Sequence, residues 1–123
     1  MGKEFTSTKN ALVVNLYGEI DQYAAAELKG RIDIEIGASS KKNLIINLKE
    51  VTLMDSSGIG LIVGRYKTVR AIGGKLVLCG AIQTIKRMIE LSGIGKVIEC
   101  YKDVHEADFA LQDTNKGERN EMK

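Results

Sequence analysis

Two serines stand directly behind an aspartate in the stretch Asp55-Ser56-Ser57-Gly58. A serine hydroxyl can act as a nucleophile, cap a helix or carry a phosphate, so its surroundings decide between these roles. Hydrophobic residues at helical spacing follow the stretch, which places Asp55 and Ser56 where a helix begins. A phosphate on Ser56 would meet the free N–H groups and the positive end of that helix.

The sequence lacks the other residues that a catalytic serine would need. In the nucleophile elbow G-x-S-x-G, the first glycine is replaced here by Met54, and the single histidine, His105, is expected on a surface helix. The glycines that follow match neither a dinucleotide-binding loop nor a Walker A loop. The sequence therefore predicts a protein without enzyme activity and without a nucleotide site.

Metal and cofactor sites are not predicted either. Glu19, Asp21 and Asp55 carry oxygens that a divalent cation accepts, but two aspartates ahead of predicted helices are better explained as helix caps. Cys79 and Cys100 lie in apolar surroundings without a C-x-x-C motif. They are expected to be reduced core residues of a cytoplasmic protein.

Composition limits the class of partner. The 123 residues are enough for one domain with a hydrophobic core. A net charge of +2 with scattered lysines and arginines gives no basic surface, so nucleic-acid binding is not expected. No hydrophobic run approaches the ~20 residues that cross a bilayer, so a membrane is not expected as a partner.

Periodicity predicts an α/β fold of a single domain. We expect a mixed sheet of about four to five strands, which opens with an N-terminal hairpin and carries about four packed helices. The strands are predicted at residues 3–8, 11–17, 44–48, 75–79 and 97–101, and the helices at 22–36, 56–72, 83–91 and 104–111. Residues 18–21 and 49–54 are expected as connections. The domain spans residues 1–111, and the polar segment 112–123 reads as a disordered tail.

The predicted second helix contains glycines that weaken it. Each costs about 0.5–1 kcal/mol relative to alanine, and Ser56, Gly60, Gly64 and Lys67 fall on one stripe of the helix. Two explanations remain open. The glycines either let a neighbouring helix pack closely, or they form a flat docking surface for another protein.

The same residues carry a family resemblance. Residues 53–60, together with Gly64-Arg65-Tyr66-Lys67 and Ile72-Gly73-Gly74, resemble the anti-sigma factor antagonists that define the STAS domain. The similarity covers residues 1–111 and is greatest to the sporulation branch, which acts on the anti-sigma F factor. It implies that the anti-sigma factor, a serine kinase, phosphorylates Ser56 and that a serine phosphatase reverses this. The unphosphorylated form would bind the anti-sigma factor and release the sigma factor.

The resemblance also places the turn of Glu19 and Asp21 near the phosphorylated serine. Ser57 is the alternative phosphate acceptor, although it is expected to bond locally within the first turn. A STAS adaptor of another partner-switching, stress-signalling or lipid-transport complex is the alternative function, because fold alone does not determine function. The expected partner-facing surface comprises Glu19, Asp21, Asp55, Ser57, Gly58, Gly60, Gly64 and Lys67.

Overall fold

The computed structural model describes the backbone of residues 2–121 and the side chains of residues 3–112. The predicted α/β fold, with an N-terminal hairpin, five strands and four α-helices, is confirmed. In chain order the elements are β1 (Gly2–Ser7), β2 (Ala11–Ile20), α1 (Gln22–Ala38), β3 (Asn43–Met54), α2 (Ser56–Ala71), β4 (Leu76–Cys79), α3 (Gln83–Ser92), the short 3-10 helix η1 (Ile94–Lys96), β5 (Cys100–Tyr101) and α4 (Val104–Glu121).

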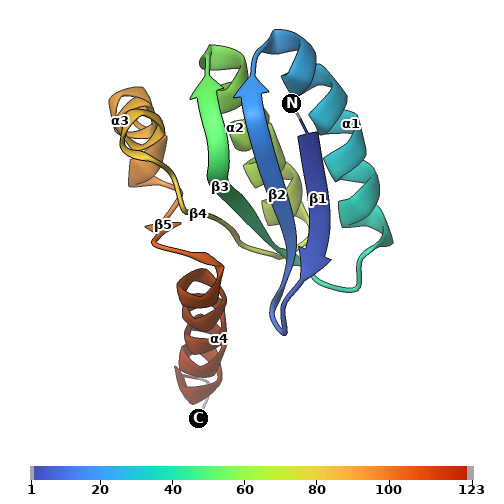
Figure 1. Ribbon diagram of the computed structural model, residues 1–123. Helices are drawn as coiled ribbons and strands as arrows, with labels where there is room; N and C mark the ends of the chain where they lie inside the picture. Colours follow the sequence, from blue (N-terminus) through green and yellow to red (C-terminus); the bar gives the residue numbers. More distant parts are fainter. Residues whose placement is uncertain (1, 122–123) are drawn as a thin grey trace.

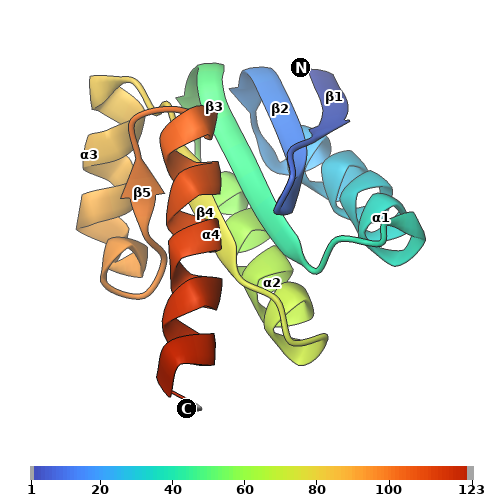
Figure 2. The same cartoon turned by 90° about the horizontal axis from the view of Figure 1, so that it is seen from below.

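The sheet follows chain order, β1-β2-β3-β4-β5. The β1–β2 pair is antiparallel, and each later pair is parallel. Successive right-handed crossovers between neighbouring parallel strands place their helices on the same face. Helices α1, α2 and α3 therefore cover one face, and α4 packs on the other (Figures 1 and 2). The parallel strands end at one edge, where the helices that follow them begin.

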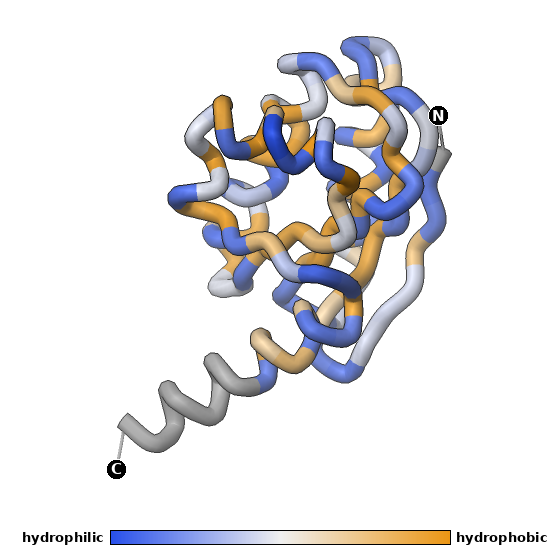
Figure 3. Tube along the Cα trace, turned by 60° about the vertical axis from the view of Figure 1, so that its left-hand side comes forward, coloured by the Kyte–Doolittle hydropathy of each residue, from blue (hydrophilic) through white to orange (hydrophobic). Residues whose placement is uncertain are grey.

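Two hydrophobic layers fill the space between sheet and helices. The larger lies under α1, α2 and α3, and the smaller lies under Ala107 and Leu111 of α4. Leu44, Ile45 and Ile46 of β3 are all buried, as their unbroken hydrophobic run predicts for a strand covered on both faces. In Figure 3 hydrophobic stretches gather in the interior of the trace.

Strands β2 and β3 are longer than predicted. The expected connections at residues 18–21 and 49–54 were wrong for all but Asp21, because the two strands stay paired as far as Ile20 and Met54. The register shifts between Asn15 and Tyr17 and again between Gly18, whose φ is +86°, and Glu19. Many side chains in these extensions are exposed and polar, so this part of the sequence resembles a loop.

The C-terminal part also differs from the prediction. Of the strand expected at residues 97–101, only Cys100 and Tyr101 pair with β4. Helix α4 continues past the predicted domain boundary at residue 111. Side chains beyond Gln112 lie outside the described residues, so the tail predicted for residues 112–123 stays a prediction.

Candidate functional site

Ser56 is the first residue of α2, and it is exposed. Asp55 caps this helix from an extended conformation, and its Oδ1 accepts a hydrogen bond of 2.8 Å from the Ser57 N–H. The Asp55 carbonyl accepts a second bond, 3.0 Å long, from the Gly58 N–H. Asp55 therefore holds the first turn, and the neighbouring Ser56 is left accessible to solvent.

The end of β2, which carries Glu19, and the following residue Asp21 lie beside this helix start. The Asp55 N–H donates to the carbonyl oxygen of Ile20 over 3.2 Å, and Glu19 pairs with Leu53 in the β2–β3 register. Asp21 caps α1, since its Oδ1 accepts from the Ala24 N–H at 2.9 Å. The predicted proximity and both predicted caps are confirmed. Among the described residues, no cluster of three or more potential ligands could hold a metal ion.

The stripe of α2 faces outward. Ser56, Gly60 and Lys67 are exposed, and Gly64 is partly exposed. A Cβ added at Gly60 or at Gly64 would meet no atom within 4 Å, apart from its chain neighbours and the backbone of its own helix. These two glycines therefore do not make room for a neighbouring helix, which removes the first of the two explanations. We call Ser56, Gly60, Gly64 and Lys67 the α2 strip.

Gly58 has a different role. It is buried, and a Cβ at this position would lie 2.8 Å from Sδ of Met54 and still closer to its Cγ. The missing side chain makes room for Met54 at the end of β3. This corrects the expected position of Gly58 on the partner-facing surface, because the residue lies in the interior.

Arg65 is a structural residue that sequence reasoning missed. Its side chain is 5% exposed, and its Nε lies 2.9 Å from Oδ1 of Asp33 in α1. The predicted apolar face of α2 comprised Ile59, Ile62, Val63, Tyr66 and Val69. Of these, Ile62 and Val69 are buried, and Ile59 and Tyr66 are partly buried and pack against the core. The prediction missed Leu61 and Arg65, which are buried as well.

The two cysteines differ in exposure. Both are free; Cys79 is buried as expected, but Cys100 is exposed, which corrects its expected place in the core. Loss of hydration on burial raises the pKa of the Cys79 thiol to about 12. Cys79 is therefore an inert thiol in the folded protein.

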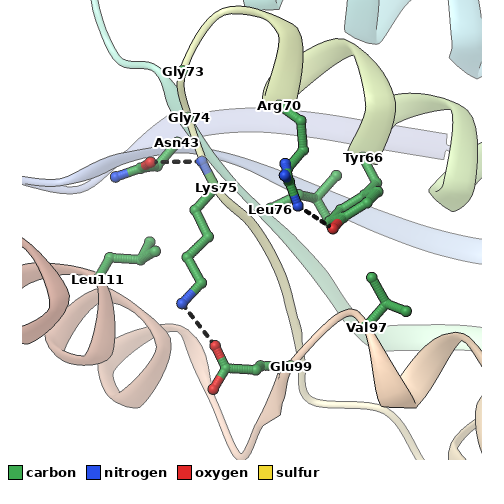
Figure 4. Close-up of a pocket in the computed structure, with 10 residues that line it drawn as sticks. All are labelled: Asn43, Tyr66, Arg70, Gly73, Gly74, Lys75, Leu76, Val97, Glu99 and Leu111. Atoms are coloured by element: carbon green, nitrogen blue, oxygen red, sulfur yellow. Dashed lines mark hydrogen bonds and ion pairs between the residues drawn. The ribbon is translucent and has the colours of Figure 1, made fainter.

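A cavity of about 350 Å³ lies where β3 and β4 begin, at the opposite end of these strands from Ser56. Figure 4 shows the residues that line it. The Lys75 ammonium forms an ion pair of 2.8 Å with Glu99, and its hydrogen bond holds the pKa of Glu99 below the usual range. Arg70 donates to the hydroxyl of Tyr66 over 2.8 Å. The charged groups of this cavity are thus engaged by one another or by neighbours, which favours a structural role.

Comparison with known proteins identifies the fold. Residues 3–107 match the family model of the STAS domain, a range that includes Ser56, the α2 strip and the turn at Asp21. The chain belongs to the STAS domain family. Within this STAS domain, the helix start at Ser56 is the best-defined candidate for a functional site, because it combines an exposed hydroxyl with an unobstructed helix surface.

Two relatives of this STAS protein are anti-sigma factor antagonists. The anti-sigma F factor antagonist of Paenibacillus polymyxa is 31% identical over 98 residues, which are 80% of this chain and 84% of that protein. The anti-sigma-B factor antagonist of Bacillus subtilis is 35% identical over 91 residues, 74% of this chain and 82% of that protein.

Solved structures of a third relative show the same fold. The anti-sigma factor antagonist SpoIIAA in its unphosphorylated form has a TM-score of 0.78 at 26% identity, covering 91% of this chain and 97% of its own. The phosphorylated form of SpoIIAA from Bacillus has a TM-score of 0.67 at 27% identity, covering 86% and 96%. Among the described helices, none has both the length and the hydrophobicity to cross a membrane.

Proposed function

We propose that this chain is an anti-sigma factor antagonist that acts by binding and not by catalysis. In its unmodified form it binds an anti-sigma factor, itself a serine kinase, and so releases the sigma factor held by that protein. The observation that carries the proposal is the exposed Ser56 at the start of an α2 strip whose glycines serve no internal packing. The curated relatives support it, since they are antagonists of this class.

The α2 strip is suited to a close protein contact. Because Gly60 and Gly64 lack side chains, a partner can approach the helix backbone along one side of α2. At its start, the strip is flanked by the exposed carboxylates of Asp21 and Asp55. Together with Glu19 they make the Ser56 end of this surface acidic. We therefore expect a partner that presents basic groups there.

Phosphorylation of Ser56 is the proposed off-switch, and a serine phosphatase resets it. SpoIIAA has been solved in both an unphosphorylated and a phosphorylated form, which supports a switch of this kind in a relative. Ser57 is less suited than Ser56 because it is partly buried and its N–H is held by the Asp55 carboxylate. The kinase is proposed to be the anti-sigma factor itself.

The function is tested by adding the purified chain to a preformed complex of an anti-sigma factor with its sigma factor. We expect a new complex with the anti-sigma factor and free sigma factor, separated by size-exclusion chromatography. A STAS adaptor of another complex would leave the preformed complex intact. The proposal would be wrong if the chain released sigma factor from none of the anti-sigma kinases that the source genome encodes.

Replacing Gly64 with Leu should weaken binding to the anti-sigma factor at least tenfold, or about 1.4 kcal/mol. The new side chain fills space in which a Cβ meets no other residue, so the free energy of unfolding should stay the same or rise by about 0.5–1 kcal/mol. Titration calorimetry and urea unfolding measure the two quantities.

Gly30 of α1 provides a matched control, because it also lies in an exposed helix position where a Cβ would meet nothing within 4 Å. Gly30→Leu should leave affinity unchanged. A docking role for the α2 strip would be wrong if both leucine variants bound like the unmodified chain.

A further inference from the structure

A second cavity, of about 400 Å³, lies at the carboxyl ends of β4 and β5. After β4 the chain enters α3, on the face that α1 and α2 cover, whereas after β5 it enters α4 on the opposite face. In Figures 1 and 2, β5 lies between α3 and α4. The segments that leave these two adjacent parallel strands thus turn to opposite sides of the sheet, and the second cavity lies between them.

Two lysines line this cavity without a carboxylate partner. Among the described residues, neither Lys86 of α3 nor Lys102 after β5 forms an ion pair. Glu106 is the acidic residue of the lining, and its Oε1 accepts a bond of 3.4 Å from the Lys102 backbone N–H. Because Lys75 of the first cavity is paired with Glu99, the positive charge of the second cavity is more available to a ligand than that of the first.

The start of α3 adds hydrogen-bond donors at the same place. Residue Ile82 precedes α3 and supplies no side-chain cap, whereas Asp21 and Asp55 cap α1 and α2. Gly80 and Ala81, which lead into α3, line the cavity. The first-turn N–H groups of this ten-residue helix therefore have no side-chain acceptor, and they favour negative charge nearby.

The rest of the lining is apolar. Tyr101 contributes a partly exposed aromatic ring, and the buried residues Leu78 and Ile89 lie behind the wall of the cavity. A volume of about 400 Å³ falls in the range of about 300–1,000 Å³ that small-molecule sites occupy. The site thus offers positive charge to one end of a ligand and an apolar wall to the other.

We propose that this cavity binds a small organic anion. Its carboxylate or phosphate group lies between Lys86 and Lys102 near the start of α3, and its apolar body packs against the ring of Tyr101. The site is separate from Ser56 and from the α2 strip. It does not depend on the function proposed above.

Cys100 is a built-in reporter, because it lines the cavity and is exposed, whereas Cys79 is buried with its pKa raised to about 12. Alkylation of the native protein by iodoacetamide should therefore modify Cys100. We expect saturating phenyl phosphate or benzoate to slow this alkylation at least fivefold, and inorganic phosphate to act only at much higher concentration. The first two probes distinguish a phosphate ligand from a carboxylate ligand. Cys100→Ser should abolish the signal.

The double variant Lys86→Gln/Lys102→Gln should need at least tenfold more phenyl phosphate or benzoate for half-protection. Lys96→Gln, in η1 and outside the cavity lining, is the matched control and should behave like the unmodified chain. Burial raises the pKa of the Cys100 thiol and Lys86 opposes this, so each variant is compared with itself with and without probe. The proposal is overturned if neither organic probe protects Cys100, or if the double variant is protected as well as the unmodified chain.

Discussion

Phosphorylation of Ser56 should lower affinity for the anti-sigma factor about 30-fold or more while the fold survives. The phosphate adds about −1.5 to −2 charges at pH 7, and the N-terminus of α2 returns about 0.3–1 kcal/mol of stabilisation. Ser56 is exposed in the free protein, so water solvates the new charge. In a complex the same charge is pressed into the interface beside Asp55. An uncompensated buried charge there costs about 2–5 kcal/mol.

Three variants separate the hydroxyl from its neighbour. Ser56→Ala should bind the anti-sigma factor without accepting phosphate, and Ser56→Asp should bind poorly with a near-normal melting temperature. Ser57→Ala should still be phosphorylated. Phosphopeptide mapping after kinase treatment and calorimetric titration of both forms give the readouts. Phosphate found on Ser57 alone, or equal affinity of the two forms, would contradict the switch.

Replacing Asp33 with Ala should lower the free energy of unfolding by about 3 kcal/mol. The change leaves the Arg65 guanidinium buried between α1 and α2 without its partner at 2.9 Å. Breaking a buried pair from one side typically costs about 3–5 kcal/mol, and we expect the lower end because the Asp33 side chain is 35% exposed. Urea unfolding measures the loss.

The double variant Asp33→Ala/Arg65→Leu should recover most of this stability, because neither charge then remains in the interior. Lys29 supplies a matched control, since its Nζ lies 3.9 Å from the other oxygen of Asp33 on the helix surface. Lys29→Ala should cost less than about 0.5 kcal/mol, as exposed pairs do. Equal loss in the single and double variants would show that the pair itself does not cause the effect.

Local signals explain what the sequence could predict. Asp21 and Asp55 precede hydrophobic residues at helical spacing, and each caps its helix as expected. The unbroken run at Leu44, Ile45 and Ile46 identifies a strand covered on both faces. The order and the type of the helices and strands follow from such short-range patterns. The placement of Ser56 at the start of α2 follows from them as well.

The remaining features depend on contacts between distant residues. Arg65 can face inward only because Asp33 of another helix meets it, and its own surroundings in the sequence do not show this. Gly58 and Gly60 were both predicted on the partner-facing surface, yet Met54 fills the space over the first and nothing fills the space over the second. The lengths of β2 and β3 were missed because both strands continue by pairing with each other across register shifts. Hydrophobic alternation does not mark this continuation in the sequence.

The hydrogen bond from the Asp55 N–H to the Ile20 carbonyl joins two backbones, so this link between the ends of β2 and β3 does not itself depend on side chains. Exposed residues outside the Asp55 cap, such as Glu19 and Lys67, can therefore be exchanged without breaking it. Among proteins that share this scaffold, substitutions at Glu19, Gly60 or Lys67 could then change the proposed partner. Cross-talk between parallel signalling systems would then be set by a few surface positions, which makes this edge of the sheet the place to re-engineer partner choice.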